Sequence, residues 1–116
     1  MAASKSPRAR LLHMRDEIDG VAMVVRGLSF VQYQGSYMHR RAVERAVQIV
    51  SEAAKALPSD HLAKYPGAPR NAIIGIGNIL RHEYQHLDDR QLWEIATVHL
   101  PKLQPIVQQM LTELGG

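Results

Sequence analysis

Apolar side chains recur at three- and four-residue steps along most of the chain, the spacing of a single buried helix face. The first such stretch begins at Ser6-Pro7, where serine can cap a helix and proline suits its first position. A second stretch runs from about Tyr37 to Leu57, with a proline directly after it. Between the two helices the pattern stops at residues 32–36, which we therefore expect to form a loop.

The second half of the chain predicts three more helices. A long one is expected over about residues 70–85, and another is capped by Asp88 or Asp89. The last starts near Pro101, and Pro105 would kink or restart it, because a proline ring clashes with the preceding turn and supplies no N–H.

Strand signals are nearly absent, and no internal repeat is visible. The pattern therefore predicts an all-α fold, a four- to five-helix up-and-down bundle. A length of 116 residues suits one domain, so we expect a single helical domain over 1–116 with a flexible N-terminus at 1–7.

Composition narrows the class of protein only a little. The chain is 46% hydrophobic and 22% charged, as soluble globular proteins are. It has no cysteine, which excludes disulfides and thiolate metal sites. A net charge of +3 allows RNA or an acidic partner without requiring either. No stretch has the apolar length of a signal peptide or a membrane span, so we expect a cytoplasmic protein with no membrane partner.

Residues 82–86 read His-Glu-Tyr-Gln-His, the pattern in which zinc metallopeptidases bind metal through two histidines one helical turn apart. The extended form of that motif requires a glycine where this chain has Asp89 and a histidine where it has Leu92. A small helical domain also offers no sheet to hold a peptide substrate. We therefore expect neither a metal centre nor a cofactor, and a surface zinc site on His82 and His86 is the weaker alternative.

The same segment carries a polar helix face. Asn78, Arg81, His82 and Gln85 share that face by their three- and four-residue spacings. Such a set suits RNA cleavage by a ribose 2′-hydroxyl, because histidine can move the proton and arginine can neutralise the phosphate. No metal is needed, since the nucleophile belongs to the RNA. The alternative is a solvated helix end whose cations oppose the helix dipole.

Further candidates lie near the predicted loop. Arg40 and Arg41, next to His39, can form an RNA-binding patch or simply a solvated helix face. Tyr33 and Tyr37 flank the loop and can either stack on a nucleobase or pack.

The sequence also indicates a role for two residues outside these groups. Trp93, the only tryptophan, lies in an apolar stripe and is expected to pack rather than bind a base. Glu52 is surrounded by Ser51, Ala53 and Ala54, whose small size suits close helix contact, and it can pair with an arginine.

From about Leu11 to Leu111 the chain resembles the HepT-like family, a branch of the HEPN domains (higher eukaryote and prokaryote nucleotide-binding). The matching features, in order, are the first-helix stripe, the segment 42–55, Tyr65-Pro66-Gly67, Ile73-Ile74-Gly75, Asn78, His82-Glu83-Tyr84, Leu92-Trp93-Glu94-Ile95 and Leu100-Pro101-Lys102-Leu103. Their order and spacing over nearly the whole chain make the resemblance specific.

The resemblance implies a HEPN-like helical homodimer that acts as the toxin of a bacterial toxin–antitoxin pair and cuts RNA without metal. It implies a motif of arginine, four to six residues, histidine, one residue and tyrosine, placed at the cleft between subunits. His82 would then be the catalytic histidine, and Asn78 matches the asparagine that follows the motif arginine. The implied partner is a small MntA-like nucleotidyltransferase antitoxin that attaches AMP to the tyrosine, here Tyr84.

This sequence departs from that motif at the arginine. The allowed positions hold Gly75, Ile76 and Gly77, and the nearest arginine is Arg81, directly before His82. One residue turns a side chain about 100° around a helix, yet a long arginine can still reach the same phosphate.

Two functions therefore stay open. The first is an endoribonuclease that uses His82, Arg81 and Asn78. The second is a non-catalytic HEPN module that binds a nucleotidyltransferase partner or a nucleotide. A structural bundle without chemistry explains the clustered motif poorly.

Overall fold

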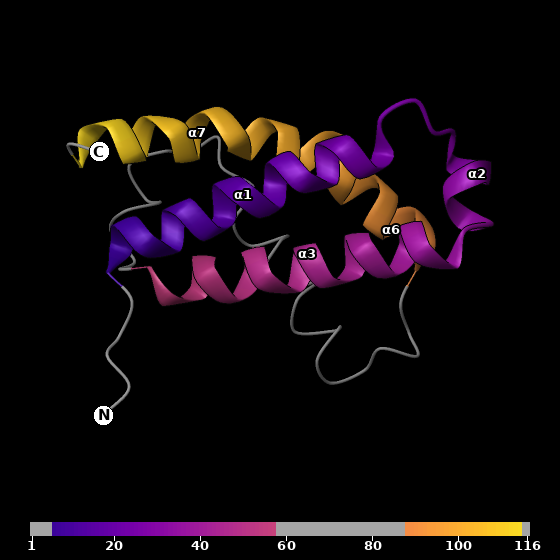
Figure 1. Cartoon of the computed structure of the whole chain (residues 1–116), viewed down its shortest axis with the longest axis horizontal. Helices are drawn as coiled ribbons and strands as arrows, with labels where there is room; N and C mark the ends of the chain where they lie inside the picture. Colours follow the sequence, from indigo (N-terminus) through magenta and orange to yellow (C-terminus); the bar gives the residue numbers. More distant parts are fainter. Residues whose placement is uncertain (1–5, 58–87, 115–116) are drawn as a thin grey trace.

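The computed structural model describes residues 6–57 and 88–114, and within these ranges the regular secondary structure is entirely helical. The elements are α1 (Pro7–Val25), α2 (Phe30–Gln34), α3 (Tyr37–Ala56), α6 (Asp89–Glu94), the π-helix η2 (Ile95–His99) and α7 (Leu100–Glu113) (Figure 1). The predicted all-α class is confirmed. The helix predicted over about residues 70–85 lies outside the described residues.

Helix α1 begins as its sequence predicts. The Ser6 hydroxyl accepts a hydrogen bond from the Ala9 N–H at 3.1 Å, and Pro7 occupies the first turn. The segment 1–7, predicted as a flexible N-terminus, thus includes the cap Ser6 and the first helical residue, Pro7. Gly27 follows the helix with φ of 76°, a left-handed conformation that glycine adopts without strain.

The loop predicted over residues 32–36 is wrong in part, because α2 occupies Phe30–Gln34. A capping box starts this helix: the Ser29 hydroxyl accepts from the Gln32 N–H at 3.1 Å, and the Gln32 side chain accepts from the Ser29 N–H at 2.9 Å. Five residues are too few to show a helical period, so the only sign of this helix in the sequence is the pair of capping residues, Ser29 and Gln32.

Helix α3 spans Tyr37–Ala56, within one residue of its predicted bounds. The Ser36 hydroxyl caps it by accepting from the His39 N–H at 3.3 Å. Its buried face pairs Val43, Val47 and Val50 with small alanines and serine, which lets α1 approach closely.

Helices α6, η2 and α7 follow one another without a break, and the chain changes direction between α6 and α7 (Figure 1). Asp88 caps α6 by accepting from the Arg90 N–H at 2.8 Å, as one of the two predicted caps. In η2 the Ile95 carbonyl accepts from the Leu100 N–H, five residues on. The residue after Leu100 is Pro101, which has no N–H to offer, and a π-turn accommodates that gap.

Helix α7 continues through Pro105 to Glu113, so this proline does not restart the helix. Because Pro105 has no N–H, the helical bond to the carbonyl of Pro101, four residues earlier, is not made. The predicted start of the last helix is correct within one residue.

Helix α1 lies between α3 and α7 and supplies the centre of the core (Figure 1). The fully buried large side chains of the described residues are Leu11, Met14, Val21, Tyr33, Val43, Val47, Val50, Leu92, Leu100, Leu103 and Val107. Trp93 packs against this core, which confirms its predicted packing role. None of the helices in the described ranges is long and apolar enough to span a membrane.

Candidate functional site

The residues predicted to act in catalysis, Asn78, Arg81 and His82, lie outside the described residues, as do Tyr84 and Gly77. Their roles stay predictions. In the described part of the chain, no group of three or more His, Cys, Asp or Glu side chains is arranged to hold a metal ion. The candidate residues that the structure does place, Arg40 and Arg41, lie in the first turns of α3.

Arg41 is held by two neighbours on its own helix. Its Nη1 donates to both carboxylate oxygens of Glu44, at 2.7 and 2.8 Å, and its guanidinium lies 4.7 Å from the centre of the Tyr37 ring. The side-chain contact with Tyr37, followed by the charge of Glu44, raises the pKa of Arg41 above its ordinary value. Much of its charge is therefore balanced by Glu44, while Tyr37 stays 63% exposed.

Arg40, the residue before Arg41, has neither an ion pair nor a ring contact among the described residues. Its side chain is half-buried, and its Nε atom is buried without a hydrogen-bond partner among the described residues. Within residues 6–57 and 88–114 it forms no ion pair. Arg40 is thus a cation whose terminal nitrogens keep their capacity to donate to an incoming anion.

Tyr33 is fully buried, and its hydroxyl likewise has no hydrogen-bond partner in the described part of the chain. Burial raises the pKa of Tyr33 well above its ordinary value, the nearby carboxylates of Asp89 and Glu44 raise it further, and Arg40 opposes them. Of the two roles expected for this tyrosine, base stacking or packing, the structure shows packing. A fully buried ring cannot stack on a base.

The Tyr33 ring belongs to an aromatic cluster that joins α2 to α6. Its centre lies 5.2 Å from the Trp93 ring and 6.4 Å from the Phe30 ring, and the last two are 6.1 Å apart in an edge-on arrangement. Arg90 covers the outer side of Phe30, with its guanidinium carbon 4.0 Å from the ring centre.

Arg40 and Arg41 at the start of α3 and Arg90 on α6 belong to helices that contact each other and α2 (Figure 1), and we call these three residues the arginine patch. Sequence reasoning found the first two and missed Arg90. Nothing local marks that residue, because it lies about fifty positions away along the chain and reaches the patch only through packing.

Comparison of the sequence with known protein families identifies the family of this chain. The family described as "Ribonuclease HepT-like" matches residues 14–110, more than four-fifths of the chain. The chain belongs to the HepT-like family. The expected resemblance, and with it the HEPN-like fold, is thereby confirmed.

Several proteins similar to this HepT-like chain carry provisional names as RNases. One, from Caldanaerobacter subterraneus, is 32% identical over 107 residues, covering 92% of this chain and 96% of the relative. Another, from Methanocaldococcus jannaschii, is 27% identical over 106 residues and covers 91% and 97%. A third, from Thermococcus cleftensis, is named provisionally as ribonuclease HepT and is 26% identical over 100 residues, covering 86% and 91%. No solved structure matches the chain.

Because burial raises the pKa of Tyr33, we predict that the stability of the protein falls at alkaline pH. The unfolded tyrosine loses its proton near pH 10.0, whereas the folded one keeps it to higher pH. The free energy of unfolding should therefore fall as pH rises above that value, by up to about 1.4 kcal/mol per pH unit. Replacement of Tyr33 by Phe should remove this dependence. At neutral pH it should leave the free energy of unfolding unchanged or raise it, because the buried hydroxyl has no described partner to lose.

The measurement is urea unfolding of the wild type and of Tyr33→Phe at pH 7 and at about pH 11. Lysines and the other tyrosines titrate in both proteins, so the difference between them isolates Tyr33. Two curves that decline in parallel above pH 10 would contradict the prediction.

Proposed function

We propose that this chain is an endoribonuclease that cleaves RNA without a metal ion, by attack of a ribose 2′-hydroxyl on the adjacent phosphate. The observation that carries the proposal is membership of the HepT-like family over residues 14–110, together with relatives of nearly equal length that bear RNase names. The polar set of Asn78, Arg81 and His82 within that match supplies groups for the reaction.

In the proposed reaction His82 takes the proton of the 2′-hydroxyl or gives one to the departing 5′-oxygen. Arg81 neutralises the negative charge that builds up on the phosphate oxygens, and Asn78 donates a hydrogen bond to them. The bond from phosphorus to the 2′-oxygen forms as the bond to the 5′-oxygen breaks. The products are a 2′,3′-cyclic phosphate and a free 5′-hydroxyl.

We further propose that the chain is the toxin of a toxin–antitoxin pair in the cytoplasm, and that it works as a homodimer. Its partner would be a small nucleotidyltransferase that silences it by attaching AMP to Tyr84. This tyrosine stands two positions after His82, so a bulky, negatively charged group there would crowd the proposed site and repel RNA.

For substrate RNA, we propose different roles for Arg40 and Arg41 of the arginine patch. Arg40, with no ion pair in the described ranges, is suited to bind a backbone phosphate. Arg41 is engaged with Glu44, and its contact with Tyr37 holds that exposed ring as a surface on which a base can stack.

The catalytic proposal predicts RNA cleavage in EDTA by the purified protein. His82→Ala should lower the rate by about 10²–10⁴-fold, the usual contribution of a general acid or base. Arg81→Ala should also slow the reaction if this arginine replaces the one missing from positions 75–77. Cleavage is followed on a labelled oligonucleotide, and the product ends are identified by mass spectrometry. A wild type no faster than His82→Ala would refute the proposal.

A second candidate function follows from the same missing arginine. Gly75, Ile76 and Gly77 occupy its allowed positions, whereas Tyr84 is present, so a chain without RNase activity could still serve as a binding module for a nucleotidyltransferase. Co-expression with a nucleotidyltransferase encoded beside this chain should give a complex and add one AMP unit to the peptide that carries Tyr84. Tyr84→Phe should bind the partner yet stay unmodified. Absence of both complex and added mass excludes this function.

The two roles in the arginine patch predict different salt dependences of RNA binding. Arg40→Ala should weaken binding and reduce the slope of log affinity against log salt by about 0.7, the value for one phosphate contact on a single strand. Arg41→Ala removes the same charge one residue away and should change the slope less, because Glu44 already balances it. Arg40→Lys, which keeps the charge, should restore the slope. Equal slopes for the two alanine variants would contradict the proposal that Arg40 and Arg41 have different roles in RNA binding.

A further inference from the structure

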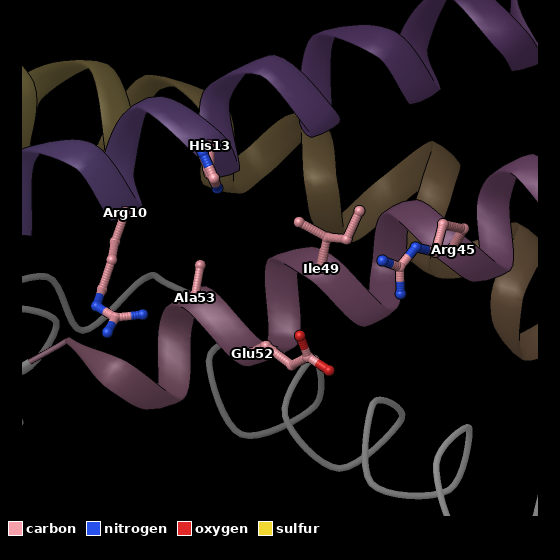
Figure 2. Close-up of a pocket in the computed structure, with 6 residues that line it drawn as sticks. All are labelled: Arg10, His13, Arg45, Ile49, Glu52 and Ala53. Carbon is pink, nitrogen blue, oxygen red and sulfur yellow. The ribbon is translucent and has the colours of Figure 1, made fainter. Parts of the chain in front are cut away.

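A second basic site lies on a different part of the bundle, between the N-terminal half of α1 and the C-terminal two-thirds of α3. A pocket of about 260 Å³ opens there. Its walls are formed by Arg10, His13, Arg45, Ile49, Glu52 and Ala53 (Figure 2). Ligand pockets start at about this size, so the space suits a phosphate with its sugar better than a large ligand.

The lining follows from helix periodicity on both sides. Arg45, Ile49 and Glu52 are four and three residues apart and share one face of α3, while Arg10 and His13 are three apart on α1. Figure 2 shows the Glu52 carboxylate between the side chains of the two arginines in this view. Cations from two separate helices thus border the same hollow, which a solvated face of a single helix would not produce.

The arginines of this pocket are not engaged by carboxylates in the part of the chain that the structure describes. Arg10 is half-buried and forms no ion pair there. Arg45 donates to the Gln48 side-chain oxygen at 3.2 Å, a neutral partner that leaves its charge uncompensated. Each guanidinium therefore keeps donors for an anion. Because the two arginines lie toward opposite ends of the pocket (Figure 2), they are placed for successive phosphates of one strand.

The carboxylate makes the pocket selective. The Glu52 carboxylate repels a phosphate placed against it, but it accepts hydrogen bonds from hydroxyl groups. Its two oxygens have lone pairs for more than one partner. A ligand that fits must carry an anion toward the arginines and a hydroxyl toward Glu52, with an apolar surface against Ile49 and Ala53. A ribonucleotide unit has all three features, whereas its deoxy counterpart lacks the 2′-hydroxyl.

We propose that this pocket binds one ribose of the RNA strand, with Arg10 and Arg45 on the phosphates at its two ends and Glu52 on the 2′-hydroxyl between them. The inference rests on the proposed function, since it supplies that activity with a way to hold RNA and to reject DNA. It is separate from the arginine patch, which recognises phosphate and base but no sugar hydroxyl.

The experiment measures binding of a labelled single-stranded RNA, and of DNA with the same sequence, by fluorescence anisotropy. A His82→Ala background prevents cleavage. Arg10→Ala and Arg45→Ala should each weaken RNA and DNA binding about tenfold, as loss of a hydrogen bond to a charged group does. Lys55→Ala is the matched control, because it removes one charge from an exposed position of the same helix, α3, outside the pocket.

Glu52→Ala provides the more specific test. Loss of the carboxylate relieves repulsion, so DNA should bind as well as before or better, while the preference for RNA over DNA should fall several-fold. All four variants change exposed or half-buried positions, and circular dichroism checks that each keeps its helical content.

The outcomes separate the two proposals. If RNA is bound but the pocket variants behave like Lys55→Ala, or if Glu52→Ala leaves the RNA preference intact, the pocket proposal is overturned and the RNase proposal stands. If the pocket variants act as expected but the wild type never cuts RNA, the RNase proposal fails and the pocket stands. A protein that binds no RNA at all overturns both.

Discussion

Burial of α1 on two sides is the constraint on which the rest of the structure depends. Leu11, Met14, Ile18 and Val21 are almost completely buried between α3 and α7. Each such side chain contributes about 1.5–3 kcal/mol relative to an exposed one, so this stripe supplies much of what holds the helices together. It also fixes which face of α3 meets α1, and the pocket with Arg10 and Arg45 lies along that contact.

A second constraint acts at the end of the bundle that carries the arginine patch. Tyr33 fills the space between α2, α3 and α6, and its aromatic neighbours secure it there. A buried hydroxyl and a buried guanidinium nitrogen without described partners cost stability, by roughly 1–3 kcal/mol for each such group. Such a cost is usual where a protein keeps polar groups for a ligand, and it fits the role proposed for Arg40 in binding phosphate.

The turn from α6 into α7 links these two regions. One π-helical segment, set just before Pro101, redirects the chain so that α6 reaches α2 and α3 while α7 runs along α1 (Figure 1). Asp89 at the start of α6 brings a carboxylate near Tyr33, and Arg90 is positioned by the same helix. The balance of charge at this end is therefore set by elements from both halves of the chain.

Periodicity, capping residues and motif order are local or linear properties, so the sequence alone was enough for the helical class, the start of α1, the bounds of α3 and the family. It also gave Asp88 as one of two candidate caps for α6. It missed α2, whose five residues are too short for a period, and it left Arg40 and Arg41 equivalent. The structure distinguishes them, since Glu44 pairs with Arg41 while Arg40 has a buried Nε without a described partner. Arg90 and the pocket between α1 and α3 likewise emerged only from packing, which brings together side chains that are distant along the chain.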